Sequence, residues 1–252
     1  MKYTPFLLIA ICLLSCSEDE PKTNDQRDET ELTDSFDGSG SLIDYVTNNA
    51  SALPDVGRSD GRYRANLVDN TDNITLHYHE DQGRLDAKRV DFPFEFIARN
   101  IGVGTQSDSQ TAPSGSGDPF IFCGVQVHTL DLASPNSSHV VVGHRGSTHF
   151  TIEGKNTLNG VSSVNDAGAN IVPEGRADIR IVGNADRTIT VYWQLPNFGD
   201  SSNDNWVLYN DTGALPGTAP EFGESVYVGL ITYAFYSTGL PFVGTCDAID
   251  IQ

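Results

Sequence analysis

The sequence predicts an all-β domain, and three observations support this fold class. Apolar and polar residues alternate along many short runs, as expected for strands with one buried face. The 24 glycines and 12 prolines suit numerous turns between such strands. No long segment has apolar residues at helical spacing. The length of 252 residues fits one all-β domain with additional segments.

The chain begins with the features of a targeting segment. A basic residue, Lys2, precedes the apolar run Phe6–Leu14, which is too short to span a membrane. The run ends in Leu13-Leu14-Ser15-Cys16, which resembles the lipobox of bacterial lipoproteins. The resemblance implies a signal peptide over residues 1–15 and lipidation of Cys16. An ordinary cleaved signal peptide is the alternative.

The residues after Cys16 predict a tether. Ser17-Glu18-Asp19-Glu20 is similar to the acidic export signal of surface-exposed lipoproteins in some Gram-negative bacteria. This similarity implies a lipid-anchored outer-membrane protein that faces the cell exterior, and a periplasm-facing lipoprotein is the alternative. Residues 16–41 have almost no large apolar side chain, so we expect a disordered segment there. The folded domain is then expected over residues 42–252.

Net charge restricts the partners of this domain. The chain has 34 acidic and 15 basic residues, which gives a formal net charge of -19. Nucleic acid requires a basic face and is therefore excluded as a partner. Direct electrostatic binding to anionic lipid is disfavoured for the same reason, so the lipid anchor is the expected membrane contact. The acidic excess is explained by solubility, with bound Ca²⁺ as a second explanation.

Two segments early in the domain have patterns that leave alternatives open. Leu42–Val46 fits either a short helix or an edge strand. Asn73–His79 alternates as a strand that places His77 and His79 on one face. Two histidines so placed can bind zinc. The neighbouring sequence offers no obvious third ligand, so a solvent-facing pair is the simpler interpretation.

The middle of the chain predicts three strands, which are Phe92–Ala98, Phe120–His128 and Ser138–Arg145. In the second of these, one face carries Cys123, Val125 and Val127, and the other carries Phe122, Gly124, Gln126 and His128. The glycine beside Gln126 and His128 leaves open space, as a concave sugar-binding sheet needs. Residues 104–119 and 154–175 are expected to be loops. The second has enough Asp and Asn for a Ca²⁺ site, although no spacing matches a known calcium loop.

A β-hairpin is predicted next, because two alternating runs, Arg176–Val182 and Arg187–Gln194, flank a Gly/Asn/Asp cluster. In the second run Ile189, Val191 and Trp193 share one face, opposite Tyr192 and Gln194. Trp193 is therefore assigned to the core. Three more strands are expected in the C-terminal region, namely Asn205–Tyr209, Val226–Tyr233 and Gly244–Ile251.

The order of these C-terminal strands resembles a known superfamily. An alternating strand with arginine is followed by a Thr-rich strand, a Trp, the strand Val226-Tyr-Val-Gly-Leu230 and a closing Asp247-Ala-Ile-Asp-Ile251. This order is similar to the concanavalin A-like (laminin G/glucanase) jelly-roll superfamily, over roughly the last two-thirds of the chain. The resemblance implies a two-sheet jelly-roll sandwich. It implies an architecture more than an activity, because one fold hosts many functions.

Two cysteines remain for the folded domain, since Cys12 lies in the signal peptide and Cys16 carries the lipid. Cys123 and Cys246 each lie in a predicted strand, and the expected compartment is oxidising. A disulfide between Cys123 and Cys246 is therefore expected. Two buried free thiols are the alternative.

Polysaccharide binding without catalysis is the function that we expect. Jelly rolls of this type present aromatic side chains, which stack on sugar rings, beside polar groups that bind sugar hydroxyls. The candidate ligand-binding residues are Gln126, His128, Arg180, Tyr192 and Gln194 on polar strand faces, together with Tyr233 on a later strand. Each of them, taken singly, also fits an ordinary exposed or half-buried side chain.

A polysaccharide lyase acting on a uronic-acid polymer is the enzymatic alternative. Gln126-Val127-His128 resembles the Gln-Ile/Val-His motif of alginate lyases with this fold. The resemblance implies that Gln126 helps to neutralise a uronate carboxylate, while His128 or Tyr233 removes the proton at C5. The arginine-rich motif of those lyases is absent here. A glycoside hydrolase is less favoured, because the chain has no Glu-x-Asp-x-x-Glu motif.

A protein-interaction module of an outer-membrane assembly is the third alternative. The apolar segment Tyr236–Phe242 would suit a protein partner if it were exposed. Otherwise Phe242 tucks into the core and the segment is a turn.

Overall fold

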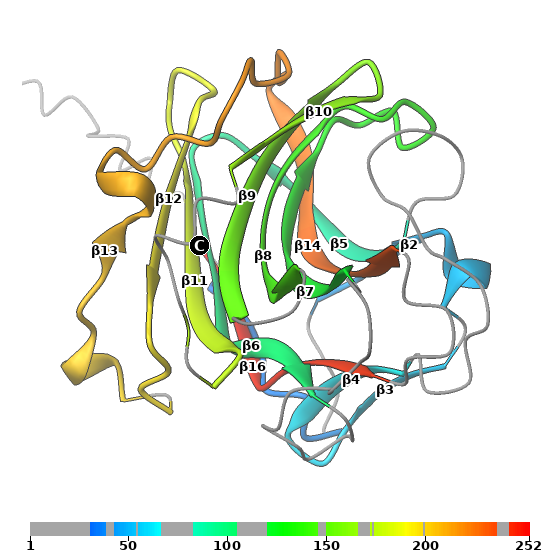
Figure 1. Ribbon diagram of the computed structural model, residues 1–252, viewed down its shortest axis with the longest axis vertical. Helices are drawn as coiled ribbons and strands as arrows, with labels where there is room; N and C mark the ends of the chain where they lie inside the picture. The colour runs from blue at the N-terminus through cyan, green and yellow to red at the C-terminus, as the bar shows by residue number, and fades with distance from the viewer. Residues whose placement is uncertain are drawn as a thin grey trace, which may run out of the picture.

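Two antiparallel sheets form the domain, packed face to face in a computed structural model of the chain (Figure 1). The structure describes residues 31–38, 43–53, 55–66, 83–104, 120–145, 150–165, 172, 174–198, 200–235 and 242–252. Three short 3₁₀ turns accompany the strands in these ranges, namely η1 (Ala50–Ala52), η2 (Ser201–Asn203) and η3 (Tyr209–Asp211). None of the helices described there is long and apolar enough to cross a membrane.

The nine-stranded sheet follows the order β13 (Val207–Leu208), β12 (Ile189–Gln194), β11 (Arg176–Gly183), β6 (Phe94–Gly104), β15 (Val243–Cys246), β4 (Arg62–Asn66) and β3 (Val56–Ser59). Its last two members are β16 (Ala248–Ile251), which pairs with β6, and β1 (Leu32–Asp34), which pairs with β16.

The seven-stranded sheet follows the order β10 (Val161–Asn165), β9 (Phe150–Leu158), β8 (Ser137–Arg145), β7 (Phe120–His128), β14 (Ser225–Phe235), β5 (Arg84–Asp91) and β2 (Val46–Asn48). Strands adjacent in space are often distant in sequence, as with β14, which lies between β7 and β5. This non-sequential antiparallel order is that of a jelly roll.

The core fills the space between the sheets. Alternate residues of β7 and β11, such as Val125 and Ile179, are fully buried there. Near one edge the sheets are also joined by polar contacts, because the Tyr63 hydroxyl on β4 donates to Asp86 on β5 at 2.8 Å. The predicted hairpin is confirmed as β11 and β12, with Ile179 paired to Trp193, and Trp193 packs against the core.

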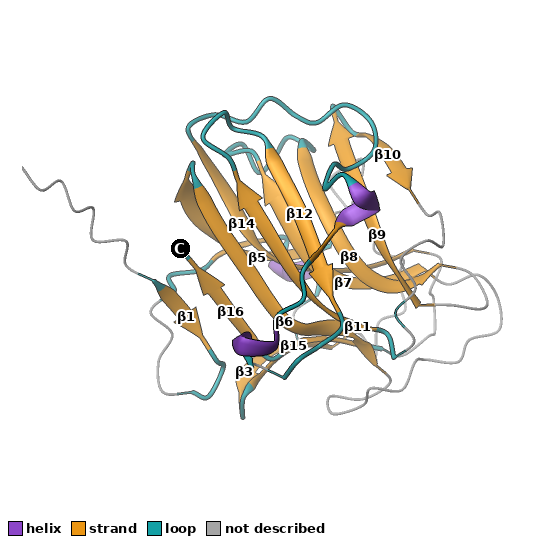
Figure 2. Ribbon diagram, turned by 90° about the vertical axis from the view of Figure 1, so that its left-hand side faces the viewer, coloured by secondary structure: helices purple, strands orange, loops and turns teal. Residues whose placement is uncertain are grey.

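The N-terminal boundary of the domain differs from the prediction. Leu32–Asp34, which was expected to lie in the tether, is a strand in register with Ile249–Ile251. Figure 2 shows β1 beside β16 at one margin of the molecule. Asp34 is buried and accepts hydrogen bonds from the Phe36 amide (2.8 Å) and the Tyr45 hydroxyl (2.8 Å). Residues 43–45 lead into the edge strand β2, which begins at Val46.

Three other predicted elements also change. The first part of the expected loop 154–175 is strand, since β9 continues to Leu158 and β10 follows. The single closing strand is interrupted at Asp247, whose carboxylate binds Arg62 Nε (2.6 Å) and Asn100 Nδ2 (2.6 Å). The strand expected over Asn205–Tyr209 shortens to the two residues of β13. His77 and His79 lie outside the described residues.

The expected disulfide is absent, and the prediction was wrong: Cys123 and Cys246 are buried free thiols. Across the sandwich, Gly244 rather than Cys246 stands against Cys123, because a Cβ added at Gly244 would lie 3.1 Å from Cys123 Cβ. Cys246 is two residues further along the strand, roughly 7 Å away. Its sulfur instead contacts the carbonyl oxygens of Arg99 (3.4 Å) and Ala248 (3.2 Å). Burial raises the pKa of Cys123 to about 11.

Candidate functional site

The candidate site lies on the face of the seven-stranded sheet that is turned away from the nine-stranded sheet, called the outer face below. Its direction follows from Cys123, whose sulfur lies 3.9 Å from the Thr245 carbonyl oxygen of the opposite sheet. Because side chains alternate along a strand, Gln126 and His128 of β7 point the other way. The two residues are therefore on the outer face, as the sequence predicted.

Strand register brings polar and aromatic side chains to this face from four neighbouring strands. His128 is paired with Tyr227 of β14 on one side and with Ser137 of β8 on the other. Gln126 is paired with His139 of β8, and His139 is paired in turn with Lys155 of β9. These residues form two adjacent rows across the sheet.

Lys155 is the centre of a buried cluster. Its ammonium group lies 2.7 Å from Glu153 Oε1 and donates to the Tyr233 hydroxyl at 2.9 Å. It also lies 5.5 Å from the centroid of the Phe122 ring and 5.1 Å from that of Tyr233. The lysine and glutamate side chains are 5% and 1% exposed. Two charges so deeply buried are tolerated because they are paired and hydrogen-bonded.

The aromatic rings complete the cluster. The Tyr233 ring lies 5.0 Å from the Phe122 ring and 5.8 Å, edge-on, from the His139 ring. Gly143 makes room for this stacking, because a Cβ there would lie 2.5 Å from a carbon of the Phe122 ring. Tyr233 thus belongs to the outer face, where it is directed towards Lys155 rather than towards His128.

His128 presents a nitrogen with no partner. Its Nδ1 donates to the Thr129 carbonyl oxygen at 2.8 Å, which leaves the lone pair on Nε2 in the neutral ring. Nε2 is buried and has no hydrogen-bond partner in the described part of the chain. Burial lowers the pKa of His128 below its ordinary value of 6.5. The imidazole is therefore neutral at neutral pH and can accept a hydrogen bond or a proton. Beside it, Gln126 Nε2 donates to the Ser137 hydroxyl at 3.0 Å.

The lowered pKa of His128 predicts a pH dependence of stability. The unfolded chain binds a proton at His128 near pH 6.5, whereas the folded chain resists protonation until a lower pH. As the pH falls from 6.5 towards the pKa of the folded state, the free energy of unfolding should therefore decrease by up to about 1.4 kcal/mol for each pH unit. Urea unfolding at several pH values should show a flatter acid limb for His128→Gln. Equal slopes in the two proteins would contradict the prediction.

The other predicted ligand residues lie on the opposite sheet, so the six do not form one site. Arg180 and Tyr192 are cross-strand partners on the outside of the nine-stranded sheet, with the guanidinium 5.1 Å from the ring centroid. Arg180 also forms an ion pair with Glu95 (2.5 Å). Gln194 is 5% exposed and donates to Asp178 (3.0 Å) and Asp204 (2.8 Å). These three residues are separated by the whole sandwich from Gln126, His128 and Tyr233.

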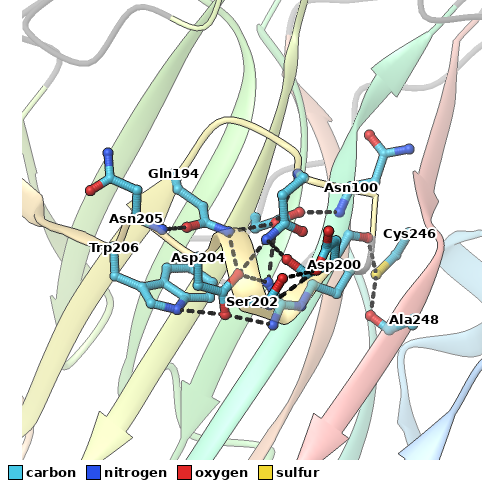
Figure 3. Close-up of polar contacts among 12 residues, drawn as sticks. Asn100, Gln194, Asp200, Ser202, Asp204, Asn205, Trp206, Cys246 and Ala248 are labelled. Carbon is cyan, nitrogen blue, oxygen red and sulfur yellow. Dashed lines mark hydrogen bonds and ion pairs between the residues drawn. The ribbon is translucent and has the colours of Figure 1, made fainter.

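Gln194 belongs to a polar network on that side of the molecule (Figure 3). The Asp204 carboxylate accepts hydrogen bonds from Arg99 Nη1 (2.8 Å) and Nη2 (3.0 Å). It also accepts one from the Trp206 indole N–H, at 3.0 Å. Burial alone would raise the pKa of Asp204, but the hydrogen bonds from Arg99 and Gln194 and the Arg99 charge lower it to about 2. The network connects Asp204 and Asn197 to Arg99, Gln194 and Asp178 of the nine-stranded sheet.

The sequence did not identify Glu153, Lys155 and Tyr227 as members of the candidate site. Glu153 and Lys155 were hidden by the polar composition of their strand, whose two faces are both rich in polar residues. Among the described residues, no group of three or more His, Cys, Asp or Glu side chains is placed to hold a metal ion.

The chain resembles solved structures but no family model. No protein-family model matches it, and no curated protein is similar enough in sequence to count as a relative. Xylan β-1,4-xylosidase from Bacillus halodurans C-125 superposes with a TM-score of 0.55 at 13% identity, over 88% of this chain and 39% of that protein. This chain thus spans well under half the length of the xylosidase.

Two smaller proteins match along almost their whole length. Lectin I from Ulex europaeus, solved with the methyl glycoside of α-L-fucose, has a TM-score of 0.48 at 12% identity over 88% of this chain and 97% of the lectin. A β-1,3-1,4-glucanase (lichenase) derived from a mouse hindgut metagenome has a TM-score of 0.45 at 7% identity over 88% of this chain and 99% of that enzyme. The strand order and the likeness to the xylosidase show the fold, which is a two-sheet jelly-roll sandwich.

Proposed function

We propose that the protein binds polysaccharide through the outer face of its seven-stranded sheet, without catalysis. The observation that carries the proposal is the convergence of Gln126, His128, Lys155, Tyr227 and Tyr233 on one face from three strands. Tyr227 is half-buried and can stack on a sugar ring, and the buried polar side chains of Gln126, His128 and Lys155 line the same face. The xylosidase of similar fold is, by its name, a protein that acts on a glycan.

The chemistry of Glu153 supports binding rather than hydrolysis. Glycoside hydrolysis uses two carboxyl groups, one of which gives up a proton. Glu153 is paired instead with an ammonium group, that of Lys155 at 2.7 Å.

The cell-surface address is part of the proposal. Cys16 is the proposed lipidation site, with the domain on the outer membrane and facing the exterior. The 15 residues between Cys16 and Leu32 would reach at most about 50 Å when fully extended, which keeps the domain close to the membrane.

A binding assay with a matched control tests the function. The chain from residue 17 onward retains every described strand, and affinity electrophoresis with xylan, mixed-linkage β-glucan and alginate would report its binding. Tyr227 is half-buried on the outer face, so Tyr227→Ala should weaken binding roughly tenfold. Val161→Ser removes a side chain that is 71% exposed on β10 and should leave binding unchanged. Binding to no polymer, or equal binding by Tyr227→Ala, would refute the proposal.

A uronate lyase is retained as a second candidate because of His128. Its buried Nε2 has no partner among the described residues and would accept the C5 proton, and the electron pair would then form the C4–C5 double bond as the O4 linkage breaks. Tyr227, directly opposite His128, would protonate the departing oxygen. Tyr233 is less suited, because its hydroxyl accepts from Lys155. Ultraviolet absorbance from unsaturated sugar ends, lost in His128→Gln, would establish lyase activity. That result would overturn the proposal of binding without catalysis.

A further inference from the structure

The loop between β7 and β8, residues 129–136, extends further than a connection between neighbouring antiparallel strands requires. A hydrogen bond from the Thr129 amide to the Asn136 carbonyl oxygen, at 3.2 Å, closes the base of the loop. Beyond this base, the Leu132 carbonyl oxygen accepts from Asn48 Nδ2 at 3.4 Å. Asn48 is in β2, at the edge of the sheet, and two strands separate β2 from β7. Residues 129–136 are called the strap below.

The strap lies over the outer face of the seven-stranded sheet. Asn48 is paired with Leu85 of β5, and the register across β14 places Leu85 in the same row as Gly124 of β7. Gly124 is on the outer face, because the preceding Cys123 points to the opposite sheet. The Asn48 side chain is therefore on the outer face as well, and the strap contacts the sheet from that side.

The route of the strap crosses the candidate site. His128 is the residue directly before the strap, and its row is separated from that of Asn48 by the row that contains Gln126. A segment that starts at His128 and reaches β2 therefore passes across both rows of the site. In this arrangement the Gln126 and His128 side chains are 1% and 0% exposed. A polysaccharide could contact neither side chain without a movement of the chain.

The strap places an acidic residue near the imidazole. The Asp131 carboxylate partly opposes the lowering of the His128 pKa by burial. A carboxylate raises the pKa of a histidine in this way when the two groups lie close together. The next residue, Leu132, is half-buried and packs against the hydrophobic core. The strap thus turns these two residues towards the sheet, whereas Leu130 is 43% exposed.

The two ends of the strap are held differently. Its C-terminal end is bound to the turn between β9 and β10, because the Asn159 amide donates to Asn136 Oδ1 at 2.7 Å and the Gly160 amide donates to the Pro135 carbonyl oxygen at 3.2 Å. The bond from Asn48 to the tip is longer, at 3.4 Å, and is correspondingly weak. A segment with one well-bonded end and a loosely bonded tip can open locally while the sheet stays folded.

We propose that the strap is a lid over the outer face, and that a ligand reaches Gln126 and His128 when its tip leaves β2. The role of the lid in ligand entry rests on the function proposed above, whereas the movement itself needs no ligand. The structure then shows the closed state. The apparent affinity for a polymer would be reduced by the fraction of molecules that are open.

Chemical labelling of His128 measures the opening without any ligand. Diethyl pyrocarbonate acylates the free nitrogen of a neutral imidazole, and mass spectrometry of the peptide that contains His128 gives the rate. Leu132→Ala weakens the packing of the tip, so labelling should be about tenfold faster than in wild type. Asn48→Ala removes the hydrogen bond and should increase the rate about threefold. Leu130→Ser, at an exposed position of the same strap, should match wild type.

The two buried thiols show whether each variant is folded. Cys123 and Cys246 are fully buried, so neither should react with a thiol reagent when only the strap opens. If Leu132→Ala made them reactive, that variant would be unfolded and Asn48→Ala would decide the question. A folded Asn48→Ala protein that is labelled at the wild-type rate would then overturn the proposal.

A covalent lock tests the role of the strap in ligand entry. Asn48→Cys with Leu132→Cys places two thiols that a short bis-maleimide can join, in the chain from residue 17 onward. The cross-linked protein should show slower labelling of His128 than wild type. In affinity electrophoresis with xylan, mixed-linkage β-glucan and alginate it should lose the retardation that the same variant shows before cross-linking. Undiminished retardation of the cross-linked protein would overturn the lid.

The two measurements separate the lid from the proposed function. If wild type is retarded by no polymer but labelling of His128 still follows the strap variants, the lid is supported and polysaccharide binding is refuted. If wild type is retarded and labelling is the same in every folded variant, the lid is refuted and polysaccharide binding stands.

Discussion

Replacing Asp86 by alanine is expected to lower the free energy of unfolding by about 3–5 kcal/mol. The Asp86 side chain is fully buried. Its carboxylate forms ion pairs with Arg84 Nε (2.9 Å) and Arg58 Nη2 (2.8 Å) and accepts a hydrogen bond from the Tyr63 hydroxyl (2.8 Å). It also accepts from the Thr47 hydroxyl at 2.6 Å. Asp86 and Arg84 lie in the seven-stranded sheet, whereas Tyr63 and Arg58 lie in the nine-stranded sheet. The substitution would remove a connection between the layers and leave Tyr63 and Arg84 without their buried acceptor.

Urea unfolding at neutral pH measures this effect, and two variants control it. Asp44→Ala, at an exposed position, should change stability by less than about 0.5 kcal/mol. Asp86→Asn keeps the shape but removes the charge, so it should be less destabilising than alanine. A loss below about 1 kcal/mol for Asp86→Ala would show that the cluster does not hold the sheets together.

Strands whose two faces differ in polarity are the easiest to predict from the sequence. The hairpin β11–β12 was predicted because Ile179 and Val191 alternate with polar residues on either side of a turn cluster. Alternation of this kind is local, so it survives without knowledge of the fold.

Strand β9 was missed for the opposite reason. Its inner face carries Gly154 and Asn156, and its outer face carries Glu153 and Lys155, so polar and apolar residues do not alternate. The turn after it, Asn159-Gly160, has positive φ at both residues (51° and 78°) and is a strong hairpin signal. Recognising that signal would have recovered β9 and β10, and with them the charged pair of the candidate site.

The prediction that the six ligand residues form one site failed for a different reason. Alternation states which residues share a face of one strand, but it does not state which sheet the strand joins. Gln126 and Tyr233 lie in one sheet, and Tyr192 and Gln194 lie in the other. The pairing of β7 with β14 depends on contacts between residues about a hundred positions apart, and no local pattern encodes it. The cysteine prediction failed similarly, because it depended on the offset between two facing strands.

Replacing Arg99 by methionine is expected to cost about 3–5 kcal/mol at neutral pH, because it breaks a buried ion cluster from its centre. The guanidinium contacts Asp178 (3.3 Å) and Asp204 (2.8 Å), and Asp178 is fully buried. Both carboxylates also accept from Gln194 Nε2, at 3.0 and 2.8 Å, so they lie close together. Without the cation they would repel each other. Methionine keeps most of the apolar volume, which limits the contribution of a cavity.

The pH dependence of this loss distinguishes charge repulsion from lost packing. In the wild type the pKa of Asp204 is lowered to about 2, so its stabilising contribution disappears only as pH falls from 3.8 towards 2. In Arg99→Met the pKa of at least one carboxyl group should rise above its ordinary value. The folded variant would then bind a proton more readily than the unfolded chain, and its stability would fall as pH rises. Its deficit should therefore be larger near pH 8 than near pH 4.

Two further variants decide whether Arg99 acts through these carboxylates. Arg187→Met, at an exposed position, should leave stability within about 0.5 kcal/mol of wild type at both pH values. Adding Asp178→Asn to Arg99→Met removes one of the two repelling charges, so the double variant should be more stable than Arg99→Met alone near pH 8. This coupling is measurable as a double-mutant cycle. If Asp178→Asn destabilised Arg99→Met by as much as it destabilises the wild type, the two residues would be energetically independent, and Asn197 and Asp204 would have to be held by their other contacts.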